Sequence, residues 1–174
     1  MGAALALFWR QGYEQTSLEE LTAAMGISRS SFYACFGSKH EALLAAAGRY
    51  CEDNLRALDA LAGAEADPAL AARAVVEAIA APEGGRHGCF LANCVTELAP
   101  HDPEIEALVR RQLARTEALL AGLLRRSAPG DSRSEDRAAA LLSLALGATM
   151  LRKAGTPPER LRVLLTQADR LISP

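Results

Sequence analysis

Apolar residues recur at helical spacing along most of this chain of 174 residues, and short polar, proline or glycine segments separate the runs. The segment at residues 16–39 shows the pattern most clearly, because a glycine divides two short apolar stripes. The stripes consist of Leu18, Leu21 and Met25 before the glycine, and of Ile27, Phe32 and Phe36 after it. Such spacing places each stripe on one face of an α-helix. The segment is therefore predicted to form a helix, a tight turn and a second helix.

Polar residues at the ends of these two helices match capping patterns. Ser17 and Glu20 stand three residues apart ahead of the first stripe, which is the spacing of a capping box. Gly26 supplies a residue that tolerates positive φ at the turn, and Ser28 can cap the second helix. The ends of both helices are therefore predicted together with their inner faces.

The outer face of the second helix suits DNA. It carries polar, small or aromatic residues, namely Arg29, Ser30, Tyr33 and Ala34. A helix in the major groove needs hydrogen-bond donors, small side chains for close approach and a group that braces it on the backbone. Ser38 and Glu41 have the spacing of a second capping box, which is expected to start a third helix and to aim Lys39 outward.

The rest of the chain is predicted to form further helices separated by loops. The predicted helices cover residues 3–11 (with Leu5 and Phe8 inward), 39–61, 67–79, 89–98, 102–124, 135–153 and 156–172, and the predicted loops cover residues 82–88 and 129–134. Asp-Pro pairs at residues 67–68 and 102–103 combine a capping side chain with proline at the first helical position. The expected fold class is all-α. We expect two domains, a three-helix helix-turn-helix head at residues 1–45 and a helical domain at residues 46–174.

Residues 138–151 are apolar nearly all round, and a helix without a polar face must be covered on both sides. One side would face the core of the chain itself. The other side carries small residues spaced four apart, Ala139, Ser143 and Gly147, which let another helix approach closely. Together with Leu161 and Leu165 of the last helix, this side is predicted to form the interface of a homodimer.

Composition excludes several classes of protein. No charge-free apolar stretch reaches the length of a membrane span, and the first residues lack the pattern of a signal peptide. A cytoplasmic protein without membrane contact is therefore expected. Cys35, Cys51, Cys89 and Cys94 show no CxxC spacing and are expected to be buried thiols in a reducing compartment. Neither a cofactor nor a metal site is expected, because His87, Cys89 and Cys94 have no fourth partner at a zinc-site spacing.

The residues at 16–39 also carry a family resemblance. They resemble the DNA-binding domain of the TetR family of transcriptional repressors at Thr16, Ser17, Leu21, Gly26, Ile27, Ser28, Phe32, Tyr33, Phe36, Ser38 and Lys39. A bare helix-turn-helix is a weak pattern, but so many matched positions in one short segment are a specific one. Family members usually begin the first helix earlier, behind a basic arm that contacts phosphates. Either such an arm has been trimmed here or this member lacks it.

The resemblance implies a transcriptional regulator of the repressor type. Such a regulator binds double-stranded operator DNA as a dimer and is released from it by an effector. Tyr33 and Lys39 would then contact phosphate, and the other interpretation is that both are ordinary surface residues. Thr16 would be a phosphate contact, a capping residue or both. Arg29 and Ser30 lie where bases would be read. The residues expected at the DNA are Thr16, Ser28, Arg29, Ser30, Ser31, Tyr33, Ala34 and Lys39.

A second part of the resemblance is the segment GCFLANCVTEL at residues 88–98. In one TetR subgroup this segment lines the effector cavity, and some members sense electrophiles through cysteine. The expected effector pocket is apolar with a few polar groups, and it comprises Cys89, Phe90, Asn93, Cys94, Glu97, Leu108 and Leu119. The effector is expected to be small and largely hydrophobic, with one hydrogen-bonding group facing Asn93 or Glu97. Cys89 is either a sensor thiol or a structural cysteine.

One alternative class is an all-helical carrier or interaction protein that kept the head but lost DNA binding. The formal net charge of −2 supports it, because nucleic-acid proteins are usually basic. Between residues 26 and 40, however, the charged side chains are Arg29 and Lys39, both positive. An enzyme is not expected, because the sequence has no GxSxG, phosphate loop or HExxH motif. Salt-sensitive binding to duplex DNA would separate the regulator from the carrier.

Overall fold

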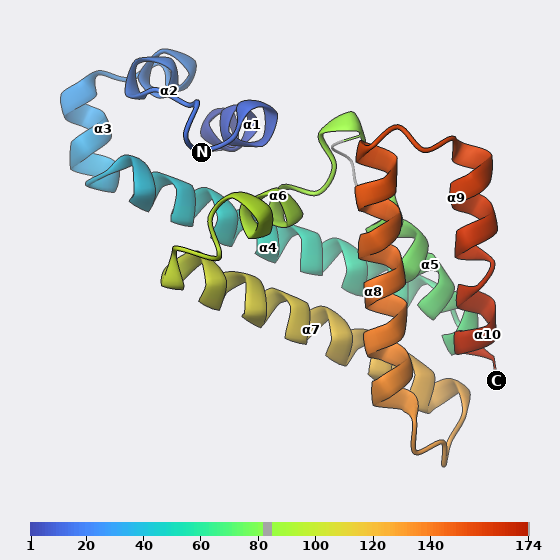
Figure 1. Ribbon diagram of the computed structural model, residues 1–174. Helices are drawn as coiled ribbons and strands as arrows, with labels where there is room; N and C mark the ends of the chain where they lie inside the picture. Colours follow the sequence, from blue (N-terminus) through green and yellow to red (C-terminus); the bar gives the residue numbers. More distant parts are fainter. Residues whose placement is uncertain (82–84, 174) are drawn as a thin grey trace. The chain divides into compact units, whose positions relative to one another are not determined.

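The computed structural model describes residues 1–81 and 85–173, and every regular element in these ranges is helical (Figure 1). The helices are α1 (Gly2–Gln11), α2 (Leu18–Met25), α3 (Arg29–Phe36), α4 (Lys39–Ala64), α5 (Pro68–Ala80), the 3-10 turn η1 (Gly85–His87), α6 (Phe90–Glu97), α7 (Pro103–Ser127), α8 (Ser134–Lys153), α9 (Pro158–Leu165) and α10 (Ala168–Ile172). The predicted all-α fold is confirmed. Of the predicted loop at residues 82–88, residues 82–84 lie outside the described ranges.

The chain packs into two compact units. The first holds Met1–Asp53 and Phe90–Val109, and the second holds Asn54–Cys89 and Arg110–Pro174. Helices α4 and α7 therefore each contribute to both units. The domain boundary expected from the sequence, between residues 45 and 46, does not coincide with the division between these units, and it stays a prediction.

The core of the first unit is built from aromatic and aliphatic side chains of α1, α2, α3, α4, α6 and α7. Its most buried large side chains are Phe8, Leu21, Phe32, Leu43 and Phe90, together with Ile105 from the start of α7 (Pro103–Ser127). The ring of Trp9 on α1 lies 5.3 Å from that of Tyr50 on α4 and 6.1 Å from that of Phe90 on α6, centroid to centroid. Aromatic pairs at this distance add stability beyond the area they bury, so α1 and α6 are fixed on the same part of α4.

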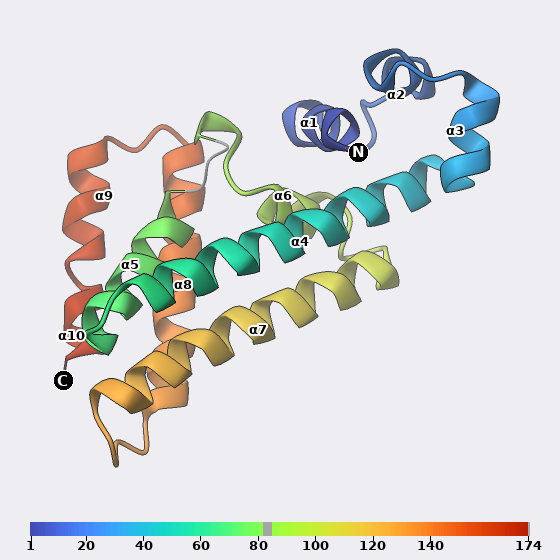
Figure 2. The same cartoon turned by 180° about the vertical axis from the view of Figure 1, so that it is seen from behind.

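Helix α8 is the centre of the second unit, where it packs against α5, α9 and α10 (Figures 1 and 2). The core there includes Val75, Leu120, Leu124, Leu141 and Leu161, and burial of each such side chain contributes roughly 1.5–3 kcal/mol. Polar side chains of α8 also reach the end of α5. Thr149 Oγ1 donates to the carbonyl oxygen of Ile79 at 2.8 Å, and Arg152 Nε donates to that of Ala80 at 3.1 Å. These bonds satisfy carbonyls that a helix end leaves without an intrahelical partner.

Some expectations about the packing are wrong. Leu5 is only half-buried, because α1 turns Ala4, Leu7 and Phe8 to the core. Cys35 is exposed on α3, whereas Cys51 and Cys94 are buried. The predicted last helix is two helices, α9 and α10. Thr166 ends the first of them, and its hydroxyl donates to the carbonyl oxygen of Val163 at 2.7 Å, a local bond that competes with continuing the helix.

No helix in the described ranges is both long enough and apolar enough to cross a membrane.

Candidate nucleic-acid interface

Helices α2 and α3 form the predicted helix-turn-helix, and local hydrogen bonds fix its corners. Ser17 Oγ accepts the Glu20 backbone N–H at 3.1 Å, while Glu20 Oε2 accepts the Ser17 backbone N–H at 2.8 Å. The predicted capping box is therefore confirmed. Gly26 ends α2 in the left-handed region at φ 66° and ψ 32°, where a side chain would be strained. Ser28 Oγ accepts the Ser31 N–H at 3.1 Å and caps α3 as predicted.

Helix α3 turns one face inward and leaves the other exposed. Phe32 is fully buried, and its ring lies 5.1 Å from that of Phe36, centroid to centroid. The opposite face is exposed over Arg29, Ser30, Ser31, Tyr33 and Ala34. We call these five residues the reading face. It offers a guanidinium, hydroxyl groups, a phenol and a small residue, which is the composition that contact with base edges and phosphates requires.

Three polar contacts tie the reading face to its surroundings. Ser28 Oγ lies 2.9 Å from the hydroxyls of both Ser30 and Ser31, so three hydroxyls cluster at the start of α3. Arg29 Nη1 lies 3.3 Å from Glu19 Oε1 of α2, and these side chains are 65% and 71% exposed. An ion pair this exposed contributes little to stability. Arg29 can therefore leave Glu19 for a stronger anionic partner at small cost.

Thr16 and Lys39 both bind backbone carbonyl oxygens near the turn between α1 and α2. Thr16 is fully buried, and its hydroxyl donates to the carbonyl oxygen of Gly12 at 2.5 Å. Lys39 Nζ donates to the carbonyl oxygens of Tyr13 and Thr16 at 2.8 and 2.9 Å, and it lies 4.2 Å from the centroid of the Tyr13 ring. The expectation that Lys39 points outward is wrong, because two carbonyls and an aromatic face hold its ammonium group. Both residues brace the turn between α1 and α2.

The same turn is also held from α6. Glu97 Oε1 accepts the backbone N–H of Glu14 at 3.0 Å. A Cβ atom at Gly12, whose φ is 85°, would lie 3.0 Å from Glu97 Oε2, so the carboxylate fits closely only because residue 12 is glycine. Glu97 was expected to face the effector pocket. This expectation is wrong for its carboxylate, which accepts a hydrogen bond from the turn after α1.

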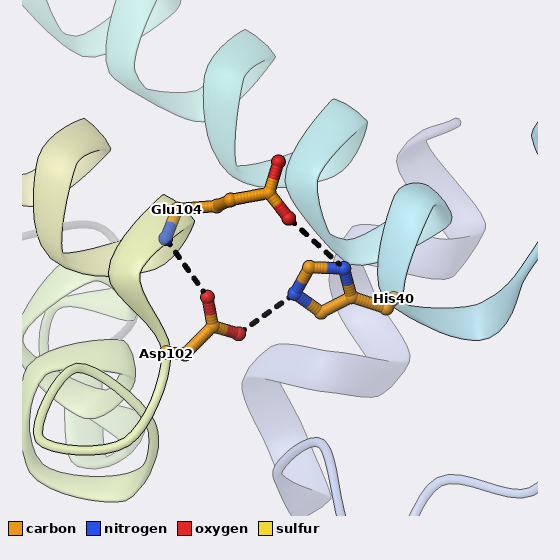
Figure 3. A group of neighbouring side chains, drawn as sticks. All are labelled: His40, Asp102 and Glu104. Carbon is orange, nitrogen blue, oxygen red and sulfur yellow. Dashed lines mark hydrogen bonds and ion pairs between the residues drawn. The ribbon is translucent and has the colours of Figure 1, made fainter.

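A second polar contact joins the start of α4 to the start of α7. His40 Nε2 lies 2.7 Å from Asp102 Oδ2, and His40 Nδ1 lies 3.7 Å from Glu104 Oε2 (Figure 3). Asp102 also caps α7, because its Oδ1 accepts the N–H groups of Glu104 and Ile105, both at 3.1 Å. Burial alone would raise the pKa of Asp102, but these bonds and the one to His40 outweigh it and lower the pKa below its ordinary value.

Sequence reasoning missed these two contacts. The contact between His40 and Asp102 joins residues 62 positions apart, and that between Glu14 and Glu97 joins residues 83 apart. Neither contact follows from a helical period or from a sequence motif. The Asp-Pro helix start was the one visible signal, and it indicated the cap but not the histidine.

The expected effector residues fall in both compact units. Phe90 and Cys94 are buried and Asn93 and Leu108 are half-buried in the first unit, whereas Cys89 and Leu119 are half-buried in the second. The ring of Phe90 also meets that of Tyr50 edge to face, with centroids 5.5 Å apart. The pocket stays a prediction.

The expected dimer residues divide into an exposed and a buried group. Ser143 and Gly147 are exposed and Ala139 is half-buried. Leu161, by contrast, is 2% exposed and lies in the core of its own unit. Placing Leu161 at a dimer interface was therefore wrong, because its side chain is already buried in that core. Leu165 is half-buried and packs at the edge of the same core.

Comparison with known proteins gives consistent matches. Residues 1–47 match the family described as "Bacterial regulatory proteins, tetR family". YezE of Bacillus subtilis, an uncharacterized HTH-type transcriptional regulator, is 34% identical over 138 residues, which cover 76% of this chain and 71% of YezE.

Solved structures share the fold over nearly the whole chain. A cysteine mutant of the TetR family transcriptional regulator CifR, complexed with double-strand operator DNA, superposes with a TM-score of 0.83 at 23% identity, covering 97% of this chain and 93% of CifR. A TetR family regulator from Cytophaga hutchinsonii superposes with a TM-score of 0.87 at 19% identity, covering 99% of this chain and 90% of that one.

Proposed function

The chain belongs to the tetR family of bacterial regulatory proteins and is a helix-turn-helix transcriptional regulator, and from this premise we propose that it is a repressor released by a small molecule. It binds a near-palindromic operator as a homodimer, and a largely hydrophobic effector in the helical domain lowers its affinity for DNA. The observation that carries the proposal is the exposed reading face of α3 above a buried Phe32.

The reading face enters the major groove. Arg29 leaves its exposed pair with Glu19 and donates to a base edge, and Tyr33, 48% exposed, braces the helix on phosphate. The hydroxyls of Ser28, Ser30 and Ser31 add donors at the start of the helix. Thr16 and Lys39 act indirectly, because they hold the turn that positions α2 and α3.

A dimer requires a surface on the second unit, and α8 supplies a suitable one. Ser143 and Gly147 are exposed there together with Met150 and Leu151, which are 44% and 42% exposed. A strip of small and apolar residues allows close helix-helix packing. A second copy of the chain gives the two-fold symmetry that a near-palindromic operator needs, with the two copies of α3 about 34–36 Å apart.

The effector site is proposed around Phe90, Cys94 and Leu108, with Asn93 as the polar group. Glu97 is left out of it because its carboxylate binds the turn after α1. An effector acts only through its difference in affinity between the DNA-bound and released states. Asn93→Leu should change the concentration of effector needed for release, and Cys89→Ser should abolish the response only if the effector attacks a thiol.

The decisive experiment measures binding to duplex DNA from around the protein's own gene by fluorescence anisotropy, across a salt titration. The wild type should bind with a steep salt dependence. Arg29→Ala should cost about 1–3 kcal/mol and relax the preference at one base position, whereas Tyr33→Ala should weaken binding to all sequences alike. Arg162→Ala on α9 is the matched control, since it removes the same charge from an exposed helix of the second unit.

Unchanged affinity in both α3 variants would contradict the proposed reading face. Salt-independent or absent DNA binding by the wild type would favour the carrier instead.

A further inference from the structure

The contact of His40 with Asp102 and Glu104 brings together three side chains that can bind a metal. One imidazole nitrogen and one oxygen of each carboxylate lie within 4.8 Å of one another. Figure 3 shows both carboxylates, from the start of α7, turned toward the imidazole of His40 at the start of α4. All three residues belong to the first unit.

We propose that His40, Asp102 and Glu104 form a binding site for a divalent transition-metal ion of the zinc class. The sequence predicts no metal site, because these ligands come from segments 62 residues apart and follow no ligand spacing. The proposal does not rest on operator binding, since the three side chains can be titrated with metal in the absence of DNA.

The geometry needs one rearrangement, because Asp102 faces Nε2 of His40 whereas Glu104 faces Nδ1, and a single ion binds only one of the two nitrogens. Two ligand atoms that each lie about 2.1 Å from an ion stand about 3–4 Å from one another. The 2.7 Å hydrogen bond between His40 Nε2 and Asp102 Oδ2 would open as the ion replaces its proton. The Glu104 side chain is 65% exposed, so it can rotate toward the ion without disturbing the core.

The surroundings already orient the two less exposed ligands. The Asp102 and His40 side chains are 16% and 30% exposed. Asp102 Oδ1 is held by two backbone N–H groups, which leaves Oδ2 facing the imidazole. The edge of His40 packs on Tyr13, with ring centroids 6.5 Å apart and planes at 87°. Partners of this kind fix ligand orientation in metal sites and tune affinity.

The charge and the donor types select the ion. The two carboxylates together carry two negative charges, which a divalent cation neutralises. The nearby Lys39 ammonium does not compete, since it donates to the carbonyl oxygens of Tyr13 and Thr16. Imidazole together with carboxylates suits Zn²⁺, Co²⁺ or Ni²⁺, whereas Mg²⁺ and Ca²⁺ prefer oxygen ligands alone. Three protein ligands leave at least one position for water.

The test uses the full-length protein, stripped with a chelator and then titrated without DNA. Zn²⁺ binding is followed by calorimetry, and Co²⁺ binding is followed by its visible absorption, which reports the coordination geometry. We expect one ion per chain at micromolar concentration, no comparable binding of Mg²⁺, and a thermal midpoint that rises with Zn²⁺ concentration. His40→Gln should weaken binding at least tenfold. Asp102→Asn should do the same while keeping a residue that caps α7.

Two controls separate this site from its neighbours. His101→Gln removes the adjacent histidine, which is exposed, and should leave binding unchanged. A double variant, His87→Gln with Cys89→Ser, removes the donors before α6 and should also leave it unchanged. The proposal is overturned if the wild type takes up no Zn²⁺ at 100-fold excess over the expected micromolar range, or if His40→Gln and Asp102→Asn bind as tightly as the wild type. Metal-free circular dichroism of each variant confirms that a loss of binding is not a loss of fold.

Discussion

Helix α3 in the first unit and helix α8 in the second both leave a strip of side chains outside the core of their own unit, and the two strips differ in chemistry. The reading face of α3 is polar and small, with one aromatic ring. The strip on α8, which comprises Ser143, Gly147, Met150 and Leu151, is apolar apart from one hydroxyl. The difference points to different partners, because a polar strip keeps its hydrogen bonds in water whereas an apolar strip gains by leaving water.

The two helices also differ in how they are held. Ser28 caps the first turn of the eight-residue α3, Gly37 ends the helix at φ 78°, and one buried ring anchors its middle. Helix α8 has no side-chain cap hydrogen bond at its first residue and depends on packing against α5, α9 and α10. A short helix positioned by its own caps can present side chains to DNA, while a long helix positioned by packing can extend that packing to a second copy.

The largest expected effect is on dimerisation and comes from a substitution in the strip on α8. Gly147→Arg should dissociate the dimer, because the side chain separates the two copies and buries an unpaired charge at a cost of about 3 kcal/mol or more, equivalent to roughly a hundredfold in the dimer dissociation constant. The monomer itself should fold, since a Cβ atom at Gly147 meets nothing within 4 Å. Sedimentation at low micromolar concentration measures the change, and operator binding should fall with it.

Gly63→Arg is the matched control for this variant. Gly63 is an exposed helical glycine of α4 with the same open surroundings, so its replacement should leave the dimer intact. A Gly147→Arg protein that still sediments as a dimer would place the interface on other helices.

Local rules predicted the elements well. The helix period, the serine caps and Gly26 gave both helices of the helix-turn-helix within a residue, and the Asp-Pro starts gave the first residues of α5 and α7. These features act between residues close in the chain, so a single sequence displays them. The exposure of the reading face followed from the burial of Phe32 on the opposite side of α3.

Contacts between distant segments could not be predicted in the same way. Leu161 and Leu165 both belong to the apolar face of α9, and only the way α9 packs on α8 shows that Leu161 is buried. Thr16 was a candidate for a phosphate contact or a capping residue, and Lys39 was expected to point outward, yet both side chains donate to carbonyl oxygens of the α1–α2 turn. Every residue has a backbone carbonyl, so the sequence does not show which carbonyl oxygen accepts a hydrogen bond from a given side chain.

A smaller effect on DNA affinity is expected from removing the charge of Glu19, which pairs with Arg29 of the reading face. Glu19→Gln should raise DNA affinity about two- to fivefold, because it frees Arg29 from an exposed ion pair worth less than about 1 kcal/mol and removes a charge that phosphates repel. The salt dependence should also steepen, since the net positive charge facing the DNA increases. Glu159→Gln on α9 removes the same charge from another exposed helix start and should have a smaller effect. A loss of affinity in Glu19→Gln would instead mean that Glu19 holds Arg29 in the orientation that reads a base.

The smallest expected effect concerns the cap of α2 and its pH dependence. Glu20 accepts hydrogen bonds from the Ser17 backbone N–H, the Gln11 amide and the Ser17 hydroxyl, and these lower its pKa below the ordinary value of 4.5. A carboxyl group whose pKa is lower in the folded state stabilises that state above pH 4.5 and loses this contribution as the pH falls through the folded-state value. Glu20→Gln keeps an oxygen acceptor but does not titrate, so its thermal midpoint should be below that of the wild type at neutral pH, and the gap should close toward pH 3. Ser17→Ala removes the hydroxyl that donates to this carboxylate and accepts the Glu20 N–H, while the backbone N–H of residue 17 still donates to the carboxylate. It should therefore lower stability by about 1 kcal/mol and remove only part of the pH-dependent gap that Glu20→Gln produces. A gap that stays constant from neutral pH to pH 3 would show that Glu20 supports α2 through packing rather than through its charge.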